Sequence, residues 1–395
     1  MERELKKQKV REFCSANDCT KLRIVHCADD LEKNEWFMPA FTYHAFGKEE
    51  LIYGYHGLTI ELTFAAMTFD CFVNVKYDSK DEEAWDLFEK LKPSLPQNAT
   101  QDRECFLERL KEIEKLSVPG TRVESYQVKD MNFELFFSEL DKDAQSKSFL
   151  DKMQKLSLWF IEGADDIDVN DSRWSLYTIW HKVNDVLFYP VGFITMFTFN
   201  LPLPQGNMTK SKRICQVVVL PPYQRQGHGE RLVKHIMKKA QEDEEIYEIT
   251  VEDPVPGFSR LRDVVDVAMC LDHSFFSSPP DQKAIGIASG TQRCTQLDIT
   301  HVKKALKVTK LQVQRCYEIL KFRRIDRADE NAYKAFRLEV KRRLHALHAE
   351  DLEAMSCVER RKGHLANLYT ELEAEYDAIL RRNNFIQNTS LDTQE

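Results

Sequence analysis

Residues 216–232 read Gln-Val-Val-Val-Leu-Pro-Pro-Tyr-Gln-Arg-Gln-Gly-His-Gly-Glu-Arg-Leu. The β-branched run Cys215–Leu220 predicts a buried strand, and the apolar residues of Gly229–Ala240 fall on one face of a helix. Ile246–Val251 predicts the next strand. Strand, glycine-containing loop, helix and strand therefore follow one another as in a βαβ unit, which places a mixed sheet with packed helices in the middle of the chain.

The loop of this unit has two glycines, Gly227 and Gly229, between the strand and the helix. The backbone N–H groups from Arg225 to Gly229 can converge on an anion at the start of the helix, where the helix dipole adds attraction. Glycine suits both positions because a side chain would keep the backbone away from phosphate oxygens. The pattern predicts a phosphate-binding loop. It has neither the lysine of a P-loop nor the third glycine of a dinucleotide-binding fold, so both of those interpretations are excluded.

Hydrophobic periodicity predicts an α+β protein in four parts, with boundaries at 1–140, 141–275, 276–345 and 346–395. In the first part we expect a hairpin, two helices and two further strands: Leu58–Tyr77, Asp81–Leu91, Cys105–Leu116, Arg122–Val128 and Asn132–Phe137. In the second we expect a helix from about Phe149 to Gly163, strands Trp174–Trp180 and Val191–Phe199, and a polar loop Gln205–Lys212 before the phosphate-binding unit. In the last two we expect helices Lys303–Phe322, Asn331–Leu344 and Asp351–Arg382, with a frayed end at Asn383–Glu395.

Composition and charge indicate which classes of partner and protein are favoured. The 395 residues carry a net charge of −8; residues 301–350 hold fourteen Lys and Arg against six Asp and Glu, a local +8, so the rest of the chain carries −16. An acidic body favours cationic partners. No run of eighteen apolar residues is free of charge, which argues against a membrane span. The cysteines show no paired metal-ligand spacing, so we expect no metal, although Cys14, Cys19 and Cys27 lie close together in sequence.

The loop resembles the Gln/Arg-x-x-Gly-x-Gly/Ala motif of the GNAT superfamily of N-acetyltransferases, with matches at Gln224, Gly227 and Gly229. Further residues resemble the catalytic subunit of type B histone acetyltransferase: Leu158–Glu162, Ile167–Asp171, Arg173, Trp174, Val251–Pro254, Leu261–Asp263 and Tyr317–Leu320. The resemblance spans roughly residues 35–345 and is densest from 156 to 263. It implies a central GNAT fold that binds acetyl-CoA, a histone-binding amino-terminal domain and a helical carboxy-terminal region. The expected coenzyme contacts are Val217, Val218, Val219, Gln224, Arg225, Gln226, Gly227, His228, Gly229 and Glu230.

Acetyl transfer to lysine needs a general base, because at pH 7 only about one lysine side chain in a few thousand is neutral. Three carboxylates are candidates: Glu252, Asp253 and Glu162. Alternation along a strand would put Glu252 and Asp253 on opposite faces if the strand continued through them, and Pro254 favours an extended Asp253. The resemblance favours Glu252 as the base, with the other two assisting. We expect direct transfer rather than an acyl intermediate on Cys215, and a structural role for His228 in the loop.

The resemblance also implies that Lys48, Glu49, Glu50, Trp174, Phe197, Thr198 and Phe199 line a groove for the tail of newly made histone H4. Three positions depart from the family, since Lys48 stands where its members tend to be acidic, and Phe197 and Phe199 stand where tyrosines are often found. The implied partners are histone H4, with H3 as a further candidate, and a WD-repeat histone-binding subunit, in the nucleus and cytoplasm. Three alternatives stay open: another protein or small-amine acceptor, a histone escort without catalysis, and nucleic-acid contact by the basic carboxy-terminal helices, which we disfavour.

Overall fold

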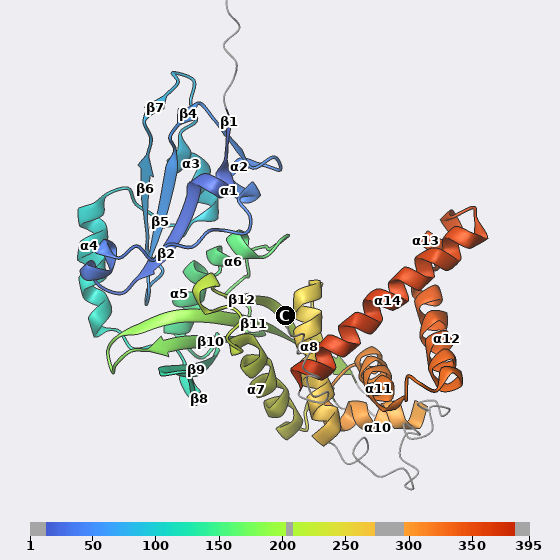
Figure 1. Ribbon diagram of the computed structural model, residues 1–395. Helices are drawn as coiled ribbons and strands as arrows, with labels where there is room; N and C mark the ends of the chain where they lie inside the picture. The colour runs from blue at the N-terminus through green and yellow to red at the C-terminus, as the bar shows by residue number, and fades with distance from the viewer. Residues whose placement is uncertain (1–12, 203–207, 273–295, 384–395) are drawn as a thin grey trace, which may run out of the picture. The chain divides into compact units, whose positions relative to one another are not determined.

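The computed structural model describes residues 13–202, 208–272 and 296–383 (Figure 1). The chain divides into two compact units. The first holds everything up to Thr198 together with Ile214–His228, and the second holds Phe199–Arg213 and Gly229–Glu395. Strands β11 (Phe188–Pro202) and β12 (Met208–Val219) belong partly to each unit. Strands and helices occur in both units, which confirms the predicted α+β class.

A six-stranded sheet has the strand order β13-β12-β11-β10-β9-β8. Its other members are β8 (Thr121–Val128), β9 (Met131–Glu139), β10 (Trp174–Lys182) and β13 (Ile246–Val251). The strands from β8 to β11 form an antiparallel meander. A second sheet has the order β2-β5-β6, in which β2 (Thr20–Val25) runs parallel to β5 (Thr59–Ala65) and β5 runs antiparallel to β6 (Cys71–Lys76). The last pair confirms the hairpin predicted at Leu58–Tyr77.

The first unit also contains short strands and helices. The strands pair as β1 (Phe13–Ser15) with β3 (Leu51–Tyr53) and β4 (Tyr55–His56) with β7 (Ser79–Lys80). The helices are α1 (Ala16–Cys19), α2 (Tyr43–Phe46), α3 (Leu87–Leu91), α4 (Arg103–Glu112), α5 (Ala144–Met153) and α6 (Lys155–Phe160). Asp86, Asp102 and Asp143 cap the N-termini of α3, α4 and α5 by accepting backbone N–H groups.

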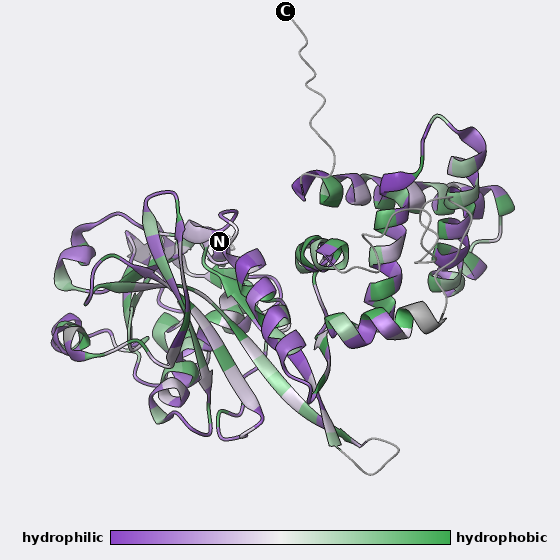
Figure 2. Ribbon diagram, turned by 90° about the horizontal axis from the view of Figure 1, so that it is seen from below, coloured by the Kyte–Doolittle hydropathy of each residue, from purple (hydrophilic) through white to green (hydrophobic). Residues whose placement is uncertain are grey.

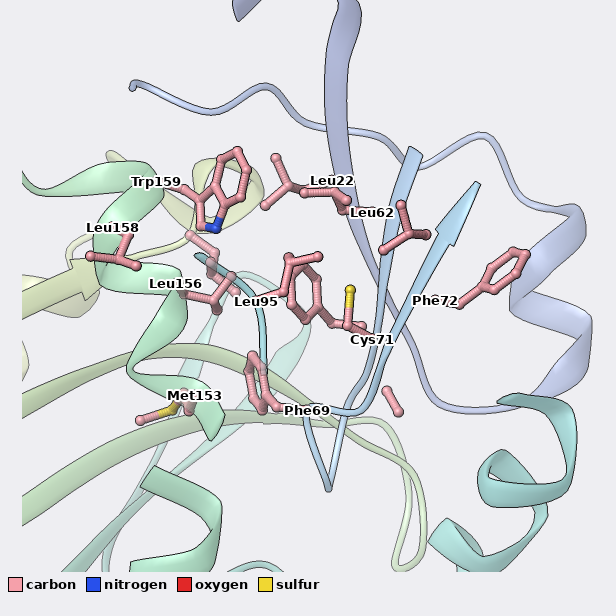
Figure 3. Packing of buried hydrophobic residues seen from close by; sticks show 14 of the residues in the cluster. Leu22, Leu62, Phe69, Cys71, Phe72, Leu95, Met153, Leu156, Leu158 and Trp159 are labelled. Carbon is pink, nitrogen blue, oxygen red and sulfur yellow. The ribbon is translucent and has the colours of Figure 1, made fainter. Parts of the chain in front are cut away.

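One hydrophobic core runs through the first unit (Figure 3). Leu22 and Leu62 of the β2-β5-β6 sheet, Met153 of α5 and Trp159 of α6 belong to the same cluster of buried side chains as Val218 of β12. The indole N–H of Trp159 donates to the Ser94 carbonyl at 3.2 Å, which satisfies the one polar group of this large side chain. Strand β12 is therefore packed from one side by a core that the amino-terminal residues largely build.

The second unit is mainly helical. Its helices are α7 (from His228 to Glu242), α8 (Pro256–Asp272), α10 (Gln296–Leu306), α11 (Lys310–Arg324), α12 (Glu330–Leu347), α13 (Ala349–Ala354) and α14 (Val358–Arg382). Hydrophobic and hydrophilic residues alternate along the helices (Figure 2), as amphipathic packing requires. Buried polar groups join them: Glu318 of α11 accepts from Arg343 of α12 at 2.8 Å and from the Tyr376 hydroxyl of α14 at 2.8 Å. None of the described helices is long and apolar enough to span a membrane.

Three predicted helices differ from the structure. One was predicted to begin too early, and two were predicted as continuous where the structure has a break. Helix α3 begins only at Leu87, because Asp86 caps it. The helix predicted to end near Gly163 is divided into α5 and α6 at Gln154, whose side chain exchanges hydrogen bonds with the backbone of Ile167. The predicted helix Lys303–Phe322 breaks at Lys307, which has a φ of 57° and whose carbonyl accepts from Ile249 N–H at 2.7 Å.

Two further predictions need correction. The predicted helix Asp351–Arg382 is interrupted after α13, since Cys357 is extended and precedes α14. Residues 208–212 are strand rather than polar loop: Lys210 N–H donates to the Glu245 carbonyl at 2.8 Å, and Thr209 and Ser211 are buried on alternate positions. The rest of that predicted loop, and the predicted fraying beyond Asn383, lie outside the described residues.

Candidate active site

The strand that leads to the phosphate-binding loop is fixed by close backbone packing. Val218 of β12 is buried, and Val217 and Val219 on either side are half-buried, as strand alternation requires. A Cβ at Gly192 of β11 would lie 2.3 Å from the Val218 carbonyl oxygen, so only glycine permits this approach of the two strands. Gln216 adds polar contacts: its side chain accepts from the Ser157 hydroxyl at 3.0 Å and donates to the Asp165 carbonyl at 2.9 Å.

The loop itself, residues 224–228, is called the coenzyme loop below. Arg225 and Gly227 both have left-handed φ angles, 61° and 90°. Successive backbone N–H groups in a turn of this kind can face one concave point, where an anion binds. A Cβ added at Gly227 would meet nothing within 4 Å, so the space in front of this glycine is open. Loop conformation and open space together fit the pyrophosphate of a coenzyme.

The glutamine side chains of the coenzyme loop hold the loop together. Gln224 donates to the Val219 carbonyl at 2.8 Å, and Gln226 donates to the Pro222 carbonyl at 3.0 Å. Both residues were predicted to contact the coenzyme, but their side-chain amides bond to the protein, and the Gln224 N–H also donates to the Pro221 carbonyl at 3.3 Å. The Arg225 side chain is exposed, whereas His228 is 1 % exposed and points into the first unit.

Helix α7 starts at the end of this loop, and Gly229 and Glu230 form its first turn in the second unit. The Glu230 carboxylate pairs with Lys234 at 2.7 Å and with Arg382 of α14 at 3.2 Å. Burial opposes its ionisation, but these two cations lower the pKa of Glu230 below its ordinary value. The carboxylate is thus neutralised within the second unit, so the contribution of Glu230 to anion binding rests on its N–H group.

Glu252 and Asp253 form an exposed turn, called the acidic turn below, directly after β13. The strand ends at Val251 and Asp253 has a left-handed φ of 33°, so the predicted regular strand with an extended Asp253 is wrong. The chain must reverse here to start α8 at Pro256, and aspartate tolerates the left-handed region better than most residues. Strand alternation therefore cannot choose between the two carboxylates. Glu252 lies 3.7 Å from Arg213, whose guanidinium stacks on the Phe199 ring at 4.7 Å.

A cavity of about 600 Å³ adjoins the acidic turn within the second unit. Its lining includes Val251 and Pro254 beside that turn, Phe258 of α8, and Arg315 of α11. Buried charged side chains of α8 lie at or near this cavity. Asp263 accepts from Arg315 at 2.6 Å and from Gln312 at 2.9 Å, but burial outweighs these partners and raises its pKa. Burial likewise raises the pKa of Asp266 to about 6, although Arg262 donates to it at 2.7 Å.

The third predicted catalytic residue, Glu162, lies in the first unit. It is exposed in the turn after α6, where Gly163 N–H donates to the Tyr43 hydroxyl at 2.7 Å. Glu252 and Asp253 belong to the second unit. The predicted catalytic carboxylates are therefore divided between the two units, and their roles stay predictions.

The predicted substrate-groove residues differ in how their side chains are used. Lys48 and Glu49 are exposed. The Glu50 carboxylate accepts from Thr42 N–H at 2.5 Å and Asn17 at 2.7 Å, and these hydrogen bonds lower its pKa despite the opposing effect of burial. The Glu50 carboxylate therefore stabilises the local loop structure through these hydrogen bonds. Trp174 packs edge-to-face on Phe197 at 4.8 Å.

Thr198 and Phe199 continue β11 beyond Phe197 and are half-buried. The boundary between the two units falls between Thr198 and Phe199.

Within the described ranges, no group of three or more His, Cys, Asp or Glu side chains is placed to hold a metal ion. Sequence reasoning missed several residues that shape the site, among them Tyr126, Gly192, Arg213 and Arg262. Of these only Gly192 left a signal, because an isolated glycine inside a strand pattern often marks close backbone approach.

Comparison with known families agrees with this geometry. Residues 12–162 match the model "Histone acetyl transferase HAT1 N-terminus", and residues 135–257 match the model of the "Acetyltransferase (GNAT) family". The second match covers the coenzyme loop and the acidic turn, and it identifies acetyl-CoA as the co-substrate. The chain is thus an acetyltransferase.

Several relatives match most of this chain. Three proteins called "Histone acetyltransferase type B catalytic subunit" are similar to this chain: one from Candida glabrata at 33 % identity, covering 94 % of this chain and 93 % of the relative; one from Kluyveromyces lactis at 31 %, covering 91 % and 90 %; and one from Homo sapiens at 30 %, covering 85 % and 81 %. At these levels of identity and coverage, the chain belongs to the family of type B histone acetyltransferase catalytic subunits.

Proposed function

We propose that this histone acetyltransferase transfers the acetyl group of acetyl-CoA to a lysine in the amino-terminal tail of newly synthesised histone H4. The observation that carries the proposal is the coenzyme loop, in which the left-handed Arg225 and Gly227 leave an open, anion-binding face at the start of α7. Acetyl-CoA supplies the activated thioester. The N–H groups from Arg225 to Gly229 hold its pyrophosphate. Residues Val217 to Val219 of β12 bind the adjoining arm.

Glu252 is the proposed general base. It takes a proton from the lysine ammonium, directly or through a water, so that the neutral amine can attack the thioester carbonyl. A β12 N–H group, for which Val218 is the candidate, stabilises the negative oxygen that develops. Asp253 and Glu162 assist by relaying protons or holding water. Exposure of Glu252 to solvent supports this role, since a base must return its proton to bulk water after each turnover.

The wider role also belongs to the proposal. Lys48–Glu50, Trp174 and Phe197–Phe199 line the groove for the H4 tail, and aromatic packing against aliphatic side-chain stems replaces the hydrogen bonds that tyrosines would make. The charge of −16 outside residues 301–350 supports a cationic substrate. A WD-repeat histone-binding subunit is the proposed partner, and histone H3 is a further candidate partner. The enzyme would act in the cytoplasm and nucleus, before histone deposition.

The test is transfer of label from acetyl-CoA to an H4 tail peptide by wild type, Glu252→Gln, Asp253→Asn and Glu162→Gln. We expect Glu252→Gln to lower turnover by roughly tenfold or more, with coenzyme affinity nearly unchanged, because the base acts in the chemical step. Glu353→Gln, a change of an exposed glutamate on α13, is the matched control. Equal turnover for wild type and Glu252→Gln would remove Glu252 from its role. Faster labelling of a small amine or an unrelated peptide than of the H4 peptide would refute the acceptor.

A further inference from the structure

The His228 side chain is turned away from the coenzyme loop's open face and into the first unit. It is 1 % exposed, whereas Gln224 and Arg225 of the same loop are exposed. Its Nδ1 atom lies 2.8 Å from the Tyr126 hydroxyl oxygen, a hydrogen-bond distance. Tyr126 is 102 residues earlier in the chain, on β8. The loop that binds the coenzyme is thus tied to the far strand of the meander.

Aromatic packing fixes the same contact. Tyr126 and Phe133 are direct cross-strand partners of β8 and β9, and their rings stack with centroids 5.5 Å apart. The His228 ring lies 4.4 Å from the Phe133 ring centroid. The cross-strand pair of Tyr126 and Phe133 forms a rigid surface. The His228 imidazole therefore packs against it in one defined position.

A second tyrosine joins the cluster from the turn that precedes the coenzyme loop. The Tyr223 hydroxyl lies 3.3 Å from Nδ1 of His181, and the Tyr223 ring packs edge-to-face on both Phe133 and His228 at 6.2 Å. Burial raises the pKa of Tyr223 to about 12 and lowers that of His181, so both are neutral at pH 7. The cluster is therefore held by ring packing and by hydrogen bonds at Tyr223 and His228, which flank residues 224–227.

We infer that Tyr126 is a positioning residue, which acts through His228 to hold the coenzyme loop in its anion-binding conformation. The inference rests on the proposed coenzyme site and adds a residue to it. Arg225 and Gly227 occupy backbone conformations that a free loop would sample only part of the time. A loop fixed beforehand does not lose that conformational freedom when the coenzyme binds, so fixing it strengthens binding. No atom of Tyr126 needs to touch the coenzyme.

The first test is Tyr126→Phe, which removes the hydroxyl and keeps the ring on Phe133. Losing one typical hydrogen bond costs about 1 kcal/mol, so we expect coenzyme A to bind about fivefold more weakly in calorimetry. KM for acetyl-CoA should rise by a similar factor while kcat stays within twofold of wild type. Tyr55→Phe is the matched control: it loses a buried hydroxyl that donates to the Trp85 carbonyl at 2.6 Å, and it should leave coenzyme affinity unchanged.

A double-mutant cycle separates positioning from general weakening of the fold. On a His228→Leu background, which keeps apolar packing but removes the hydrogen-bonding ring, Tyr126→Phe should have no further effect on coenzyme affinity. Additive effects, or equal weakening in Tyr55→Phe, would overturn the inference. If His228→Leu does not fold, the Tyr126→Phe and Tyr55→Phe comparison decides alone. Wild type that takes up no coenzyme A refutes the proposed function, whereas wild type and Tyr126→Phe that bind equally refute only the positioning role.

Discussion

The coenzyme loop and the acidic turn both contain left-handed residues, but their side chains are used in opposite ways. In the coenzyme loop, Gln224, Gln226 and His228 bond to the protein itself, and the backbone is left to face the ligand. In the acidic turn, Glu252 is about half exposed and pairs with Arg213 across 3.7 Å. A binding element gains from being fixed in advance, whereas a proton acceptor must stay open to water. The coenzyme loop thus has the fixed backbone that suits binding, and the acidic turn has the solvent-exposed carboxylate that the proposed proton transfer requires.

The acidic turn is nevertheless held from behind, by the buried charges of α8. Arg262 donates to Asp266 at 2.7 Å and reaches the carbonyl of Ile249 in β13 at 3.5 Å. Both charged side chains are nearly or fully buried. The strand before the turn and the helix after it are thus joined by one guanidinium group.

Arg262→Met should have the largest effect, because it leaves the Asp266 carboxylate buried without its cation. Breaking a buried ion pair in this way costs roughly 3–5 kcal/mol of unfolding free energy. The measurement is urea unfolding at pH 7.5. The double variant Arg262→Met with Asp266→Leu is the control, and it should recover most of the loss, since removing both charges leaves no uncompensated group. A double variant as unstable as the single one would contradict this account.

The same variant has a defined pH dependence. The folded-state pKa of Asp266, about 6, lies above its unfolded value of about 3.9, so the folded protein binds the extra proton. The cost of ionising Asp266 is therefore absent below about pH 4 and is fully present above pH 6. Without Arg262 the folded pKa rises further and the cost grows. The stability difference between wild type and Arg262→Met should shrink as pH falls from 7.5 to 5; a constant difference would assign the loss to packing instead.

Gly192→Ala tests the strand that supports the coenzyme loop. The new Cβ would lie 2.3 Å from the Val218 carbonyl oxygen, and both strands would have to shift. Such overpacking costs about 1–3 kcal/mol, so we expect an unfolding midpoint below that of wild type and weaker coenzyme binding. Gly257→Ala is the matched control, because a Cβ at Gly257 meets nothing within 4 Å. Equal midpoints for the two variants would show that β11 and β12 yield easily at Val218.

These regions also show what the sequence could and could not predict. The coenzyme loop was predictable because the end of the strand, the glycines and the start of the helix lie within the seventeen residues 216–232, and each carries a local signal. Strand β13 matches its predicted bounds, Ile246–Val251, for the same reason. The helix breaks at Gln154 and Lys307 were not predictable, since each depends on a hydrogen bond to a backbone segment outside its own helix.

The site was less predictable than the fold. Tyr126 lies 102 residues from His228, and no local pattern marks the contact. At Asp253 a local rule was available and failed: the residue before a proline is usually extended, but the turn into α8 imposes a left-handed φ. Tertiary context prevailed over local preference there. The missed residues, Tyr126, Arg213 and Arg262, act through contacts between elements, which a single sequence does not display.

Gly227→Ala tests the coenzyme loop directly. Nothing blocks the added methyl group, so the expected cost comes from the φ of 90°, which an L-residue rarely adopts. A left-handed alanine costs roughly 1–2 kcal/mol, which predicts about tenfold weaker coenzyme A binding in calorimetry with little change in kcat. Gly363→Ala on α14 is the control, because its Cβ also meets open space and its φ is not positive. Unchanged affinity in Gly227→Ala would mean that the left-handed turn is not needed for binding.

Arg213→Gln should have the smallest effect. The ion pair with Glu252 is long and both side chains are close to half exposed, and such pairs contribute at most about 1 kcal/mol. Arg213 nevertheless stacks on Phe199, so its guanidinium has a preferred position that faces the proposed base. We expect kcat to change by no more than about fivefold, and the difference from wild type to decline as salt rises from 0.05 to 0.5 M, since exposed charges are screened. A loss comparable to that of Glu252→Gln, or one that salt leaves unchanged, would mean that Arg213 takes part in the chemistry itself and that the acidic turn is as tightly organised as the coenzyme loop.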